Sequence, residues 1–354
     1  MAQLLCGRAL QGIGGGGIIS AAYVAIARGY PDALRARMMA LNSSVWILPA
    51  VLGPAISGKV TEVVGWRWVF VGVVPFLFVC AALVLRPLAR YDLRLPLPST
   101  LRVRAAAQLA VGAALLIAAP SLRSRGLLVV LALLVVGLAL GVRGFRAVLP
   151  RGTLFAARGL PAGLAVRGLL GFSFFGTEAF IPLAASRLRG ATPTEAGLAL
   201  SAGAIGWVTS SWIGERIEAR VRATGRVARV RLGFIGLAAG IALVGAALLS
   251  PLPLWIIPLG WALSGAGIGL AFTTNGLICI AAAPAGEEGN VAGQLQLVEA
   301  LGTSAGAGLG GAALAALERA GWSLGEAQLA MFSITFGAAV VGALIAPRLA
   351  TPEG

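Results

Sequence analysis

Two carboxylates embedded in apolar stretches are the side chains of this sequence best suited to carry protons. Glu178 lies among phenylalanines and small residues, and Glu299 lies in another apolar stretch nearer the C-terminus. An ionised carboxylate in hydrocarbon is costly, so such a group pairs with a cation, reaches water or takes up a proton. We predict proton coupling for both. The alternatives are that Glu178 simply reaches water at a membrane surface and that Glu299 bonds to a neighbouring helix.

A basic side chain and an amide side chain, one helical turn apart, lie at the start of a glycine-rich segment. Arg8 and Gln11 precede Gly12, and Gly14 and Gly17 complete the spacing of a nucleotide-binding loop. That loop requires a preceding strand and a soluble βαβ unit, and the sequence has neither, so we assign the glycines to close helix packing. An arginine inside a span faces a cavity or a partner, unless it reaches the nearby surface. We predict a functional role for Arg8.

Gln296 and Thr303 extend the polar character of Glu299 along one helical face. They lie three residues before it and four residues after it, which places all three side chains on the same side of a helix. Such a stripe either lines a cavity or bonds to a neighbouring helix. We predict that Gln296 belongs to a cavity.

Metal and nucleophilic chemistry lack their usual residues in this sequence. It contains no histidine, and its cysteines, Cys6, Cys80 and Cys279, each lie inside an apolar run without paired spacing. The common zinc, haem and thiol–imidazole sites are therefore excluded, and we expect neither an enzymatic reaction nor a cofactor.

The composition predicts the surroundings of these groups. Hydrophobic residues make up 58% of the 354 residues and charged residues 12%, about half the usual share for a soluble domain. That is too little charge to cover a surface in water, and lipid is the simplest alternative. Backbone groups in lipid must bond within their own segment, so apolar runs of roughly 20 residues are helices. We expect an all-α polytopic membrane protein with eleven such helices, over about 4–27, 38–58, 68–85, 105–122, 126–142, 163–185, 196–213, 232–249, 254–283, 291–317 and 327–346.

The net charge of +15 comes from arginines in the connectors between these runs. A nucleic-acid-binding protein would gather them on one folded face, so we expect no nucleic-acid partner. The connectors after the first, third, fifth and seventh runs are the richest in arginine. By the positive-inside rule these connectors are cytoplasmic, which predicts an outside N-terminus and a cytoplasmic C-terminus. We also expect the membrane to be the plasma membrane.

Two further segments have a clear structural character. Gly53, Pro54 and Gly58 combine a helix-kinking proline with residues that leave a smooth helix face. Trp66 and Arg67 directly precede an apolar run, where aromatic side chains anchor a span at the membrane interface.

In this order, three segments resemble motifs of the major facilitator superfamily, and most of all its 14-helix drug:proton antiporter branch. They are Arg8-x-x-Gln11-Gly12, Gly53-Pro54-x-x-Ser57-Gly58 and Gly65-Trp66-Arg67-Trp68. The second departs from the family at Pro49 and Ser57, where glycine is usual. The resemblance implies a major-facilitator-type helical bundle in which the eleven helices correspond to helices 4–14, without the first three. Residues 1–95 are then the remainder of the N-terminal bundle, 96–160 an extra central helix pair and 161–354 a C-terminal six-helix bundle.

The resemblance also implies a function. It suggests a secondary active transporter for proton-coupled efflux of small amphipathic or drug-like molecules, with the proton gradient as driving force and the lipid bilayer, the substrate and protons as partners. It implies a proton-transfer role for Arg8, and it places Gln11, Trp261 and Asn275 at a substrate cavity. The stretch from Gly214 to Arg226 resembles the family's cytoplasmic loop signature. The alternatives are a nutrient or metabolite symporter or facilitator of the same fold, and an inactive truncated fragment.

Overall fold

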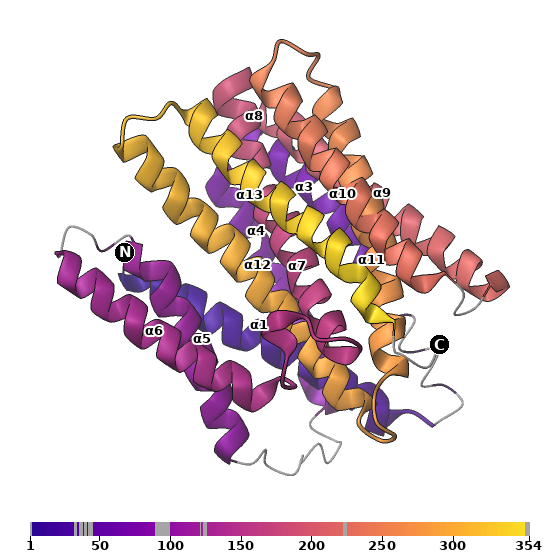
Figure 1. The fold of residues 1–354 in the computed structure, drawn as a ribbon. Coiled ribbons are helices and arrows are strands. Elements are labelled where there is room, and N and C mark those ends of the chain that lie inside the picture. The colour runs from indigo at the N-terminus through magenta and orange to yellow at the C-terminus, as the bar shows by residue number, and fades with distance from the viewer. Residues whose placement is uncertain are drawn as a thin grey trace.

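The computed structural model describes residues 2–31, 34, 38, 41, 45–88, 100–120, 122, 126–221 and 225–350. Within these ranges the chain is mostly helical and contains no strand. Figure 1 shows the helices running side by side as one elongated bundle. They are α1 (Ala2–Gly29), α3 (Ile47–Val63), α4 (Trp66–Leu88), α5 (Thr100–Ala118), α6 (Leu127–Val148), α7 (Leu160–Glu178), α8 (Ile181–Arg189), α9 (Pro193–Val221), α10 (Arg226–Leu249), α11 (Ile256–Ala281), α12 (Glu288–Arg319) and α13 (Leu324–Ile345), with short 3₁₀ turns at Thr153–Phe155 and Ala346–Leu349.

Apolar side chains cover much of the outer surface of this bundle. The clearest case is α4, where Phe70, Phe76 and Phe78 are 59%, 73% and 74% exposed. An exposed apolar surface of this extent is unstable in water and matches the hydrocarbon of a bilayer. The chain is therefore a multi-pass membrane protein.

Eight helices among the described residues are long and apolar enough to cross a membrane, and Val103–Ala118 is a shorter apolar helix. Together with α1 and α3 they correspond to the eleven expected runs, which confirms the all-α polytopic fold. The second run differs from the expectation over 38–58. Val45 and Trp46 form a turn and the described helix begins at Ile47, while residues 39, 40 and 42–44 of this run lie outside the described residues.

The expected span over 163–185 is interrupted directly after Glu178. Helix α7 ends at that residue, and α8 begins at Ile181. Pro182 explains the break, because it has no N–H to donate to the Glu178 carbonyl four residues earlier. The break leaves the Glu178 side chain at a helix end instead of in mid-helix.

Several helices are longer than their apolar runs. Helix α9 continues to Val221, past the expected end at residue 213, and α10 begins at Arg226 instead of residue 232. Lipid requires only about 20 residues of helix, but the helix itself continues until a residue stops it. Gly225, directly before α10, takes a φ of 73°, a left-handed conformation that suits glycine and precedes the first turn of that helix.

Glycines at helix crossings set the packing of the C-terminal helices. Gly265 of α11 lies against Gly203 of α9, and Gly267 lies against α10 at Gly233, each without room for a side chain. Close contact through small residues is the usual way for helices to associate in lipid. Helix α11 is consequently held between α9 and α10, and α7 packs against α12 in the same manner.

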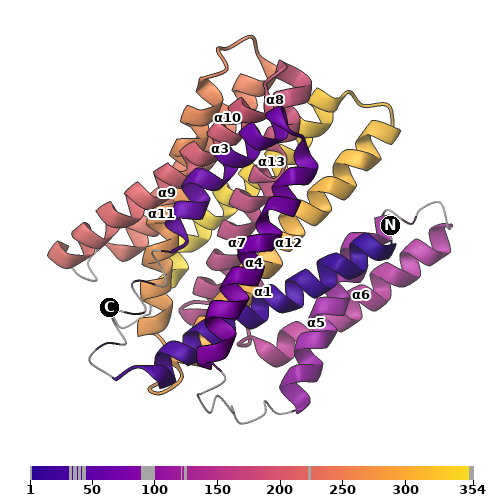
Figure 2. The same ribbon diagram turned by 180° about the vertical axis from the view of Figure 1, so that it is seen from behind.

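The remaining helices lie around this group. Seen from behind in Figure 2, α3 runs along α9 and α4 lies beside α3. Helices α5 and α6 form a hairpin of their own, in which Gly112 and Gly144 permit close contact. The hairpin meets α12, where Gly308 faces Ile117.

Candidate functional site

A ladder of aromatic side chains joins α7, α9 and α11 inside the C-terminal group of helices. The rings of Phe174 and Trp261 are stacked with centroids 4.5 Å apart, and the Trp207 ring meets Phe174 edge-on at 5.3 Å. Phe272 continues the ladder, 5.1 Å from Trp207. Trp261 is fully buried, while Trp207 and Phe272 are only partly buried. Part of the aromatic surface of the ladder is therefore not covered by other side chains.

Arg167 lies at one end of the ladder. Its guanidinium carbon is 3.5 Å from the centroid of the Phe272 ring, a close cation–π contact. The residue is 6% exposed, and its Nε and Nη1 atoms are buried without a hydrogen-bond partner. Glu299 and Cys279 are the ionisable groups in its surroundings. A buried guanidinium with free donors is suited to binding an acceptor.

Glu178 lies at the other end of the ladder, beside Trp261. The indole N–H of Trp261 lies near the Glu178 carboxylate without completing a hydrogen bond to it. The Trp261 ring is wedged against Gly203, where a side chain would overlap it. The structure thus brings together two residues that the sequence analysis selected separately, and their proposed roles stay predictions.

Glu299 lies on α12 where this helix crosses α7. A Cβ on Gly171 would lie 2.7 Å from the Glu299 carbonyl oxygen and 3.2 Å from the Thr303 hydroxyl, so these backbones nearly touch. Glu299 is half-buried, whereas Gln296 is exposed. The buried amide of this helix is Gln294, whose Nε2 donates to the Val148 carbonyl at 3.1 Å.

Asn275 is fully buried between α11 and α7. Its Nδ2 donates to the Gly163 carbonyl at 3.1 Å, and its Oδ1 makes no hydrogen bond. The structure therefore places this amide in a contact between helices, one turn from the Cys279 side chain. A role for Asn275 in substrate contact stays a prediction.

The Arg8 motif lies apart from the ladder, on α1. Arg8 Nη1 donates to Gln11 Oε1 at 3.0 Å, so the two side chains selected from the sequence contact one another. Both are exposed, as is Gly12, which has no atom within 4 Å of the position of a Cβ. Their functional role stays a prediction.

The second motif packs α3 against α9. Gly58 is buried against the carbonyl of Pro193, and the carbonyl of Pro54 lies against Gly197. Gly53, in contrast, has open space where its side chain would be. The motif therefore contributes a smooth contact surface at two of its three positions.

Trp66 and Arg67 begin α4 after a turn at Gly65, whose φ is 100°. The Arg67 guanidinium lies 4.7 Å from the centroid of the Trp66 ring, and the Trp66 ring meets Phe70 edge-on at 6.2 Å. Trp66 is 57% exposed. An exposed tryptophan with a cation at a helix start is the arrangement of an interfacial anchor.

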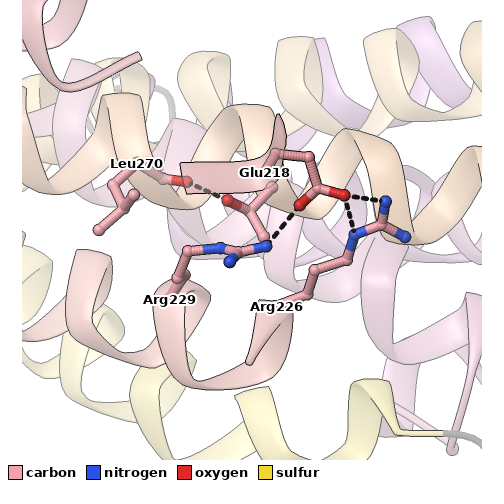
Figure 3. A network of polar contacts seen from close by, with 5 residues as sticks. Glu218, Arg226, Arg229 and Leu270 are labelled. Carbon is pink, nitrogen blue, oxygen red and sulfur yellow. Dashed lines mark hydrogen bonds and ion pairs between the residues drawn. The ribbon is translucent and has the colours of Figure 1, made fainter. Parts of the chain in front are cut away.

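A charge cluster joins the end of α9 to the beginning of α10 (Figure 3). Glu218 forms ion pairs with both Arg226 and Arg229, and the latter pair is 2.5 Å long. Leu270 lies close by in the same view, and its carbonyl accepts a hydrogen bond from the Thr274 hydroxyl at 2.7 Å. The stretch that resembles the family's cytoplasmic loop signature thus forms a defined ionic lock between two helices.

A hollow of about 450 Å³ lies at the end of α6, away from the ladder. Arg146 and Arg151 line it together with Phe155, which is 80% exposed. Such an exposed side chain marks the surface of the bundle rather than its interior, so we do not place substrate here.

Most of the ladder is not recognisable from the sequence alone. Trp261 was predicted as a site residue, whereas Trp207, Phe174 and Phe272 were not, and no role was predicted for Arg167. Arg167 could have been recognised, because an arginine inside an apolar run is rare without a partner. The aromatic residues could not, since Phe and Trp are common in membrane helices and only the packing brings them together.

Comparison with known proteins places these features in a family. Residues 1–307 match the Major Facilitator Superfamily. A probable multidrug-efflux transporter of Mycobacterium tuberculosis is 31% identical over 336 residues, which cover 88% of this chain and 68% of the relative. Multidrug resistance protein 3 of Bacillus subtilis is 39% identical over 70 residues, which cover 20% of this chain and 14% of that protein.

The fold agrees with this assignment. The crystal structure of an auto-inhibited POT family peptide transporter superposes with a TM-score of 0.59 at 18% identity, covering 91% of this chain and 73% of that one. An identity this low shows the fold alone, whereas the family match spans most of the chain. The chain belongs to the Major Facilitator Superfamily.

Proposed function

We propose that this transporter exports small amphipathic, drug-like molecules in exchange for protons. The observation that carries the proposal is the aromatic ladder with a carboxylate near each end, Glu178 beside Trp261 and Glu299 near Arg167. Aromatic faces bind planar apolar groups and attract cations. A carboxylate in lipid exchanges its proton according to what lies beside it. The similarity to a probable multidrug-efflux transporter of Mycobacterium tuberculosis supports the same interpretation.

In this proposal the substrate and the proton bind alternately at the end of the ladder that contains Glu178. A cationic amphipath stacks on the ladder when Glu178 is ionised, and a proton on Glu178 removes the charge that holds it. Alternating access between the helix groups then moves one against the other around this site. Arg8, hydrogen-bonded to Gln11, tunes the proton step from α1. No cofactor and no enzymatic reaction belong to this mechanism.

We further propose a plasma-membrane location with the N-terminus outside and the C-terminus in the cytoplasm. In Figure 1 the end of α6, the end of α9 and the C-terminus lie toward one end of the bundle. Arg146, Arg216 and Arg348 belong to that end, as the positive-inside rule requires of the cytoplasmic side. The glycine-packed hairpin α5–α6 supports residues 96–160 as a separate central pair between the helices of 1–95 and those of 161–354.

Transport by the purified protein in proteoliposomes tests the function. With a fluorescent aromatic cation as probe, an imposed proton gradient is expected to drive its movement against the proton flow. Glu178→Gln is expected to abolish the gradient dependence. Glu318→Gln, an exposed glutamate near the end of α12, is the matched control and keeps it. Probe movement that ignores the gradient in the wild type rejects antiport and favours a facilitator.

A further inference from the structure

The register between α7 and α12 brings Arg167 and Glu299 to nearly the same level along the two helices. Gly302 lies against the Gly168 carbonyl, and Gly306, four residues on, lies against the Phe172 carbonyl. The two helices therefore run parallel in a fixed register. Arg167 is one residue from this contact and Glu299 is three, so their levels differ by about 3 Å along the helices.

The surroundings of Arg167 lack the acceptors that its charge requires. The residue is 6% exposed, Phe272 covers one face of its guanidinium, and Nε and Nη1 donate to nothing. Arginine keeps its charge in proteins, so it cannot avoid this cost by losing a proton. Buried donors without acceptors are destabilising.

Glu299 is the carboxylate close enough to act electrostatically on this guanidinium. The two side chains nevertheless do not form an ion pair within 4 Å in the described part of the chain. The two side chains thus interact electrostatically without direct contact, so the ion pair between them is not formed in this structure.

We propose that Arg167 is a positioning residue for proton coupling, whose guanidinium pairs with Glu299 when this carboxylate is ionised and releases it when the carboxylate takes up a proton. The proposal rests on the proposed function and deepens it, because it names the partner that controls the second proton site. The proton comes from water and forms an O–H bond on Glu299, and Arg167 keeps its own protons throughout.

The other ionisable groups on neighbouring helices do not compete for this role. Helix α7 carries Glu178, three turns from Arg167, and α11 carries Cys279. Helix α13 carries Glu326 in its first turn, and α5 carries Arg104 near its start. Among the described residues, Arg167 is the charged group that acts on Glu299.

Replacing Arg167 by a neutral residue is expected to shift the pH dependence of exchange in one direction. Without Arg167 the ionised form of Glu299 loses its partner, so the carboxylate holds its proton to higher pH and releases it less readily. Arg167→Gln is therefore expected to move the pH of half-maximal exchange upward by about one unit, a tenfold change in proton concentration. Arg167→Lys keeps the charge but not the planar fork, and is expected to shift it less.

The experiment measures exchange of a fluorescent aromatic cation in proteoliposomes as a function of internal pH. Wild type, Arg167→Gln, Arg167→Lys, Glu299→Gln and the double variant Arg167→Gln/Glu299→Gln are compared, with Arg158→Gln in the exposed connector before α7 as control. The double variant is expected to match Glu299→Gln, since Arg167 acts through Glu299. A profile unmoved by Arg167→Gln, with a proton-driven wild type, overturns the inference.

Failure of the proposed function looks different, because the wild type itself then shows no response to the proton gradient. A folding defect is also informative. If Arg167→Gln is not monodisperse in detergent, the double variant is expected to recover, because it leaves no carboxylate without its counter-ion. A double variant that stays misfolded contradicts the pairing.

Discussion

The backbone carbonyl of Pro54 on α3 lies directly against Gly197 on α9, with no space for a side chain between them. One turn further along α3, Gly58 meets the carbonyl of Pro193 in the same way, and the Thr194 hydroxyl bonds to Glu62. These contacts join a helix of the N-terminal part of the chain to a helix of the C-terminal part. A motif that reads in sequence only as a kinked, smooth helix is thus one side of the joint between them.

The first prediction concerns this joint. Gly58→Ala places a methyl group into the Pro193 carbonyl, and the forced separation is expected to cost about 1–3 kcal/mol in the free energy of unfolding. Gly53→Ala, on the same helix with open space around it, is expected to be neutral or to stabilise by up to about 1 kcal/mol. Thermal unfolding in detergent measures both. Equal effects of the two substitutions would mean that the contact does not hold the helices together.

The second prediction concerns the ionic lock of Figure 3. Glu218→Ala removes the carboxylate that pairs with both Arg226 and Arg229, whose side chains are 21% and 9% exposed. Charged hydrogen bonds of this partly buried kind contribute about 1.5–3 kcal/mol, so the melting temperature is expected to fall measurably. Glu215→Ala, one turn earlier and exposed, is the control and is expected to change stability by less than about 0.5 kcal/mol. High salt should narrow the difference, since it screens the exposed share of the pairs.

The third prediction concerns the hydrogen bonds made by Arg189 in the last turn of α8. Its guanidinium donates to the carbonyl of Ala247 in the last turn of α10 and to those of Ser250 and Leu252 just beyond it. The last carbonyls of a helix have no partner within the helix, so such donors stabilise its end. Arg189→Ala is expected to loosen α8, seen as faster amide hydrogen exchange over 181–189 and a lower melting temperature. Arg187→Ala, exposed two residues earlier, is the control. Unchanged exchange in Arg189→Ala would show that α8 is held by its apolar contacts alone.

The membrane-spanning helices could be predicted from the sequence because a chain segment in hydrocarbon must satisfy its own backbone hydrogen bonds. A run of about 20 apolar residues has few structural options in lipid, so the number and order of spans follow from composition. The helix ends do not follow in this way. Val221 ends α9 well past its apolar run, and only the neighbouring Glu218 cluster explains why the polar extension stays helical.

The site was less accessible to sequence reasoning for a geometric reason. Glu178 and Glu299 stand out individually because charge is rare in a span. Their connection through Phe174, Trp207 and Phe272 depends on which faces of α7, α9 and α11 meet, and that is decided by glycine contacts between helices that are far apart in the sequence. Gln294 shows the same limit. Its burial was not distinguishable from the exposed Gln296 without the position of the α6 end.

The last prediction tests whether the ladder binds substrate. Trp207 is its central ring, between Phe174 and Phe272, and is partly exposed. Trp207→Ala is expected to raise the KM for an aromatic cation by about 5- to 30-fold, because stacking and cation–π contacts contribute about 1–2 kcal/mol, while Trp207→Phe keeps most of the affinity.

The control for this experiment lies on the same helix. Trp212 is 55% exposed on α9 and contributes no ring to the ladder, so Trp212→Ala is expected to leave the KM unchanged. Proteoliposome uptake under a fixed proton gradient gives KM and maximal rate separately. A fall in maximal rate at constant KM in Trp207→Ala would make the ladder a packing element, because lost stacking on substrate acts on affinity whereas a disturbed helix contact acts on the rate of the conformational change.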